Sequence, residues 1–145
     1  MERGLPAVRQ YLLLILAALA LCLTACAPAA RATVLIEYHR TGGIAGFDDR
    51  LVIMTDGTVQ ITRRTGTSTA TIGGEDLNRL IAFFDQAGFA RLDREYLPAN
   101  NCCDLFDYVV TYRGHTVHTM DTAVPESLQP ALRELDGLLS KYGNP

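Results

Sequence analysis

The chain has 145 residues, 48% of them hydrophobic, and a formal net charge of −3 at pH 7. It contains a single lysine, Lys141, and no cluster of basic residues, so we exclude a nucleic-acid-binding protein, which needs a concentrated cationic face. The length accommodates one domain of ordinary size.

The first 25 residues have the pattern of a secretory signal peptide. Arg3 and Arg9 precede an uncharged apolar run over residues 11–23, and small residues follow it. A spanning helix needs about 20 apolar residues, which this run does not reach, so a retained membrane anchor is the weaker alternative. We expect residues 1–25 to be removed on export.

The end of the signal peptide resembles the lipobox of bacterial lipoproteins. Leu23-Thr24-Ala25 is followed by Cys26, whose sulfur would accept a diacylglyceryl group before cleavage frees the cysteine amine. An ordinary signal peptide with an incidental cysteine is the alternative. Each acyl chain contributes about 0.8 kcal/mol per buried methylene, so several chains would hold the protein at a membrane. We expect residues 26–32 to tether one domain, residues 33–145, to the outer or the inner membrane on the exported side.

Only two cysteines remain after the signal peptide and the lipidated residue are set aside. Cys102 and Cys103 are adjacent, and neighbouring Cα atoms lie about 3.8 Å apart, closer than is usual for a disulfide. An oxidising compartment would permit a strained bond between them. The chain offers no second pair that would complete a zinc site, and without Glu2, Arg3 and Arg9 it carries a net charge of −4.

The first half of the domain alternates between apolar and polar residues, as strands do. This pattern predicts strands over residues 33–40, 49–55, 58–64 and 67–72. The second and third of these are joined by Asp56-Gly57, the strongest short-range signal for a β-hairpin.

A helical period follows the four predicted strands. Apolar residues recur at helical spacing from Leu77 to Ala87, and Gly88 is expected to end this helix. The composition of residues 96–104 is typical of a loop, and alternation returns in two further strands over residues 106–112 and 115–121.

The last segment is predicted to be a helix with Ser127 as its N-cap, Pro130 in its first turn and Gly143 at its end. The order of strands, helix, strands and helix indicates the α+β class. We expect an antiparallel sheet of about five to six strands with two helices packed on one face.

The residues give little sign of catalysis. Of the three histidines, His39, His115 and His118, the last two differ by an odd number and should point to opposite faces of one strand. We interpret them as exposed strand residues rather than metal ligands. The sequence has no zinc-binding helix motif, phosphate-binding glycine loop or nucleophile elbow. We expect no enzyme activity, bound metal or cofactor.

The unusual segment is residues 41–47, in which three glycines surround two bulky apolar residues, Ile44 and Phe47. Glycines permit unusual backbone angles and let another chain approach closely. Either this is a plain hairpin connection whose two apolar side chains fold back into the core, or they project as the probes of a recognition loop.

This layout resembles the emfourin family, whose members are small proteinaceous inhibitors of thermolysin-like zinc metallopeptidases. The resemblance spans most of residues 33–142, and its distinctive part is the Gly-Gly-Ile-Ala-Gly stretch over residues 42–46. The loop over residues 100–104, with its adjacent cysteines, does not align with the family pattern. The resemblance implies that a pre-organised loop enters the active-site cleft of a secreted metalloprotease.

Roles for the loop follow from this resemblance. Ile44 or Phe47 would fill the apolar pocket beyond the scissile bond, and the glycine backbone would pair with the edge strand of the cleft. Asp48 or Asp49 would approach the catalytic zinc. The predicted binding loop therefore comprises Gly42, Gly43, Ile44, Ala45, Gly46, Phe47, Asp48 and Asp49. The alternative is a non-enzymatic envelope binding or scaffold module that docks a partner through a sheet edge or through the face bearing Tyr108 and Tyr112.

Overall fold

The structure is a computed structural model that describes residues 31–100 and 104–143. The predicted signal peptide, Cys26 and the Cys102–Cys103 pair lie outside the described residues. Residues 32–145 form one compact unit, and the buried apolar core extends from Leu35 to Leu139 within it. Because the core residues described all lie within this unit, we expect residues 32–145 to fold alone. None of the helices described is long and apolar enough to cross a membrane.

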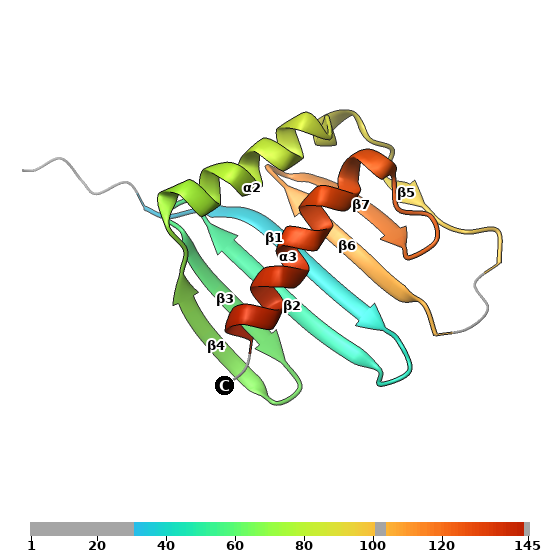
Figure 1. Ribbon diagram of the computed structural model, residues 1–145, viewed down its shortest axis with the longest axis horizontal. Helices are drawn as coiled ribbons and strands as arrows, with labels where there is room; N and C mark the ends of the chain where they lie inside the picture. Colours follow the sequence, from blue (N-terminus) through green and yellow to red (C-terminus); the bar gives the residue numbers. More distant parts are fainter. Residues whose placement is uncertain (1–30, 101–103, 144–145) are drawn as a thin grey trace, which may run out of the picture. The chain divides into compact units, whose positions relative to one another are not determined.

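The unit is a seven-stranded sheet with two helices on one of its faces (Figure 1). This confirms the predicted α+β class, although the sheet has more strands than the five to six expected. Neighbouring strands are antiparallel, except that β5 and β7 are parallel. The spatial order is β4-β3-β2-β1-β6-β7-β5. In chain order the strands are β1 (Val34–Gly42), β2 (Phe47–Met54), β3 (Thr58–Arg63), β4 (Gly66–Thr71), β5 (Glu95–Tyr96), β6 (Phe106–Tyr112) and β7 (His115–Met120).

The apolar positions of the strands face the helices, as the alternating pattern predicts. Tyr38 in the central strand β1 lies between Leu51 of β2 and Val110 of β6, and all three side chains are fully buried. The alternate side chains of the same strands lie on the other face, which no described helix covers (Figure 1). One face of the sheet therefore forms the core, and the other is an open polar face.

The two helices pack their apolar stripes on the sheet. Helix α2 (Gly74–Gln86) buries Leu80 and Phe84, and α3 (Gln129–Tyr142) buries four residues, Ala131, Leu132, Leu135 and Leu139. A short 3₁₀ helix, η1 (Phe89–Arg91), follows α2, and another, η2 (Glu126–Leu128), leads into α3.

The start of α3 corrects one prediction. Ser127 lies inside η2, and neither η2 nor α3 has a side-chain cap, so Ser127 is not the N-cap. The 3₁₀ helix η2 leads directly into α3, so the backbone before α3 is already helical and no side chain caps the helix. Pro130 does lie in the first turn and Gly143 ends the helix, as expected.

The predicted docking face bearing Tyr108 and Tyr112 is also wrong. Both side chains are buried in the core under the helices, and the ring of Tyr112 stacks on Phe84 with ring centroids 4.7 Å apart. The strand alternation places these tyrosines on the same face as Val110, so they cannot meet a partner in the folded protein.

Buried tyrosines make the fold sensitive to alkali. Burial raises the pKa of Tyr38 and Tyr108, and burial together with a hydrogen bond to Asp85 raises the pKa of Tyr112 to about 12. Unfolded tyrosines titrate near pH 10. The folded state therefore keeps protons that the unfolded state loses, and its stability should fall as the pH rises above about 10. Urea unfolding from pH 8 to 11.5 should show this loss, and Tyr112→Phe should make it shallower. An unchanged pH slope in that variant would contradict the assignment to Tyr112.

Candidate functional site

The segment singled out by the sequence forms the tip of the β1–β2 hairpin. Strand β1 ends at Gly42 and β2 begins at Phe47, so residues 43–46 form the turn, here called the hairpin tip. The Gly46 N–H donates to the Gly43 carbonyl at 2.8 Å. Gly42, Gly43 and Gly46 have φ angles of 99°, 67° and 60°, in the left-handed region that favours glycine. This turn therefore depends on its glycines.

The two apolar residues of the segment have different roles. Ile44 is 90% exposed at the hairpin tip. Phe47 is 41% exposed, and its ring packs against Phe106 with centroids 5.5 Å apart. Neither side chain folds back into the core, so that interpretation is wrong: Ile44 projects, and Phe47 packs at the base of the hairpin while remaining partly exposed.

Neighbouring segments hold the hairpin tip on both sides. On one side the Gly43 N–H donates to the Leu105 carbonyl at 3.2 Å, and a Cβ on Gly42 would clash with that carbonyl oxygen. On the other side Nη2 of Arg64, in the β3–β4 turn, donates to the Ala45 carbonyl at 2.8 Å. These contacts fix the backbone that presents Ile44.

Below the hairpin tip lies an ionic network on the helix face of the sheet. Arg40 of β1 donates to Asp49 of β2 at 2.6 Å and to Asp136 of α3 at 2.9 Å. Asp49 also lies 3.3 Å from Arg63 of β3, and the Tyr38 hydroxyl donates to Asp136 at 2.9 Å. The network thus ties three strands to α3.

Burial and pairing oppose each other within this network. Burial acts to lower the pKa of Arg40, but the bonds to Asp49 and Asp136 outweigh it and the pKa is raised. Burial raises the pKa of Asp136, against the lowering effect of Tyr38 and Arg40. Arg40 therefore stays charged and depends on its carboxylate partners.

Arg40 also connects the network to the base of the hairpin tip. Its guanidinium carbon lies 5.3 Å from the centre of the Phe47 ring and 5.2 Å from the centre of the Phe106 ring. Cation–π contacts of this kind contribute about 0.5–2 kcal/mol, more when they are desolvated. The same cation therefore holds both aromatic rings that support the turn.

The two aspartates assigned to the binding loop lie on opposite faces. Asp49 is 3% exposed and bound in the ionic network, so the prediction that it could approach a partner's zinc is wrong. Asp48 is exposed on the open face and accepts a hydrogen bond from His39 at 2.7 Å. Its position beside the hairpin tip leaves Asp48 as the accessible carboxylate of the pair.

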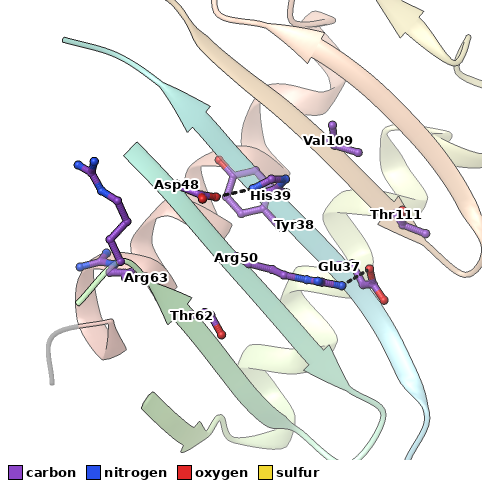
Figure 2. Close-up of a pocket in the computed structure, with 10 residues that line it drawn as sticks. Glu37, Tyr38, His39, Asp48, Arg50, Thr62, Arg63, Val109 and Thr111 are labelled. Carbon is purple, nitrogen blue, oxygen red and sulfur yellow. Dashed lines mark hydrogen bonds and ion pairs between the residues drawn. The ribbon is translucent and has the colours of Figure 1, made fainter. Parts of the chain in front are cut away.

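A shallow hollow of about 500 Å³ lies on the open face beside Asp48 (Figure 2). Two pairs of its lining residues are bonded to each other, Arg50 to Glu37 at 3.3 Å and His39 to Asp48 at 2.7 Å, and Arg63 and Arg64 add two further cations. Neutral side chains complete the lining, among them Thr62, Val109 and Thr111. The hollow thus has a mixed lining of charged and neutral side chains.

The other two histidines point to opposite faces, as their spacing predicts. On the open face Asp107 accepts a hydrogen bond from His118 at 2.7 Å. On the helix face the His115 ring contacts the Leu92 carbonyl at 3.0 Å and the edge of Phe89. Each histidine therefore has a partner of its own, and strand β6 separates His39 from His118.

Sequence reasoning overlooked Arg40 and Arg63, which form the network under the hairpin tip. The sequence did contain a signal for Arg40. Arg40 lies two and four residues after Tyr38 and Ile36 along β1, so its side chain is on the same, core-facing side of the strand. An inward-pointing arginine requires a buried acid nearby.

Within residues 31–100 and 104–143, no group of three or more His, Cys, Asp or Glu residues could hold a metal ion. Comparisons of the chain with protein-family models, curated proteins and solved structures gave no match. The candidate functional site is therefore the hairpin tip, a braced turn that exposes the bulky apolar side chain of Ile44.

Proposed function

We propose that the protein is an exported, lipid-anchored inhibitor that inserts its hairpin tip into the cleft of a secreted thermolysin-like zinc metalloprotease. The observation that carries this proposal is the 90% exposure of Ile44 on a turn held from both sides. An exposed isoleucine contributes little to the fold, so its place at the apex of a braced turn favours a role in binding.

The bracing of the hairpin tip suits an inhibitor. Binding costs free energy when loops must be ordered, and a loop already held in its bound shape avoids much of that cost. Gly43 and Ala45 are bonded to Leu105 and Arg64, and Phe47 is packed against Phe106. The turn can thus enter a cleft with little reorganisation.

Ile44 has the chemistry that the emfourin resemblance calls for. The resemblance implies a target that accepts a bulky apolar residue after the scissile bond, and Ile44 is the residue free to occupy such a pocket. Phe47 and Asp48 lie at the base of the turn, where they would contact the rim. Strong binding would bury about 800 Å² on each partner, so surfaces beside the tip must also take part.

Location is the second part of the proposal. The lipobox-like Leu23-Thr24-Ala25-Cys26 would place the inhibitor on the exported side of a bacterial membrane. There it would meet secreted proteases and protect the envelope from them.

A second candidate function is an envelope binding module that uses the open face. The hollow of about 500 Å³ beside Asp48 favours it, because hollows of this size can receive side chains or small ligands. This candidate requires no contact with Ile44, and the two functions are therefore separable by mutation.

The direct test adds purified residues 32–145 to several thermolysin-like metalloproteases and follows hydrolysis of a short peptide substrate. We expect inhibition that saturates at one domain per enzyme. A serine protease assayed in parallel controls for general interference and should keep its activity. If none of the metalloproteases is inhibited by a folded domain, the proposal is wrong.

A further inference from the structure

Strand β4 forms one edge of the sheet. It pairs with β3 on one side, and no strand among the described residues pairs with its other side. Thr67, Thr69 and Thr71 are all exposed. In Figure 1 the strand lies at the margin of the sheet, and neither helix runs along its outer side.

The register shows which backbone groups this edge offers. In an antiparallel pair, successive residues direct their N–H and C=O groups alternately toward and away from the partner strand. Ile72 directs its N–H to the Gly57 carbonyl, at 2.9 Å. The same alternation directs the backbone N–H and C=O groups of Ser68 and Ala70 toward β3. The N–H and C=O groups of Thr67, Thr69 and Thr71 therefore point away from β3.

The edge lacks the features that usually prevent pairing with another chain. Proteins protect exposed edges with charged residues, proline or bulges. The sequence of β4 is Gly-Thr-Ser-Thr-Ala-Thr, with no charge and no proline. Its register with β3 is unbroken over all six residues.

Residues 67–71 of β4, Thr-Ser-Thr-Ala-Thr, read almost the same in both directions. A second copy of β4, running antiparallel, would therefore match this edge residue by residue. We propose that β4 pairs antiparallel with β4 of a second copy of this chain, about a twofold axis at Thr69. Thr69 then faces Thr69 of the second copy, and Thr67 faces its Thr71. All three outward residues of each copy are matched, giving six hydrogen bonds, and Ser68 faces Ala70 without a clash.

This dimer does not rest on the proposed inhibitor function, because Thr69 lies in the middle of β4 and not in the hairpin tip. The pairing would join two seven-stranded sheets into one continuous sheet with a twofold interface. Both hairpin tips would remain free to bind.

Sedimentation equilibrium of residues 32–145, from roughly micromolar to millimolar concentration, tests the proposal. The wild type should pass from monomer to dimer as the concentration rises. Thr69→Pro removes an outward N–H that β3 does not use, and edge strands tolerate proline, so this variant should associate at least about tenfold more weakly. Thr69→Val keeps the N–H and is the matched control, which should associate like the wild type.

Amide exchange on the wild type provides a test that needs no variant. The N–H groups of Thr67, Thr69 and Thr71 should exchange more slowly as the protein concentration increases, whereas exposed amides elsewhere should not change. A chain that stays monomeric up to millimolar concentration, or in which these three amides exchange fast throughout, would overturn the dimer.

Discussion

Replacing Ile44 with aspartate is expected to weaken inhibition of a thermolysin-like metalloprotease by about 100-fold or more. Truncation of a central apolar anchor typically costs at least about 2 kcal/mol, and an unpaired carboxylate in an apolar pocket adds a desolvation penalty. Because Ile44 is 90% exposed in the free protein, its loss should change the free energy of unfolding by less than about 0.5 kcal/mol. Inhibition constants and urea unfolding of the same variant separate the two effects.

Val34→Asp is the matched control for this experiment. Val34 is also a large exposed apolar residue, at the end of β1 farthest from the hairpin tip. Inhibition by this variant should equal that of the wild type. If both variants inhibit as well as the wild type, the hairpin tip is not the contact surface, and the open-face binding module becomes the better explanation.

The largest loss of stability is expected for Asp49→Ala. Asp49 is 3% exposed and lies against both Arg40 and Arg63. Breaking a buried ion pair costs about 3–5 kcal/mol, and because Arg40 keeps its bond to Asp136 we expect a loss of about 3 kcal/mol. This is a large part of the roughly 5–15 kcal/mol that stabilises an ordinary domain, so urea unfolding should shift strongly or the variant should unfold.

The adjacent carboxylate supplies the control. Asp48 pairs with His39 on the open face, where an exposed ion pair contributes about 0–1 kcal/mol. Asp48→Ala should therefore unfold close to the wild type. Equal destabilisation by the two substitutions would contradict the account of the buried network, since it would show that the two faces are not different.

The alternation of apolar residues along the chain predicted most of the sheet. Strand β6 was predicted with its exact bounds, and the Asp56-Gly57 turn joins β2 to β3 as expected. Strand β5 was missed because its two residues, Glu95 and Tyr96, are too few to show a period. The Ser127 cap failed because a residue type that can cap does not cap when a 3₁₀ turn leads directly into the helix.

The candidate site was less predictable, for a physical reason. Whether Ile44 or Phe47 projects depends on the ring of Phe106, which lies about sixty residues farther along the chain and is adjacent only in the fold. The difference between Asp48 and Asp49 was accessible from sequence. Asp49 lies two and four residues before Leu51 and Ile53 along β2, so its side chain is on the same, core-facing side of the strand.

Competition with an active-site ligand tests the central claim most directly. A small zinc-chelating inhibitor would be bound to a thermolysin-like metalloprotease, and the affinity of residues 32–145 for that enzyme would be measured before and after by calorimetry. If the hairpin tip enters the cleft, the occupied enzyme should bind the domain much more weakly, in proportion to the ligand concentration. Equal affinity for the free and the occupied enzyme would show that the hairpin tip lies elsewhere and would contradict the account.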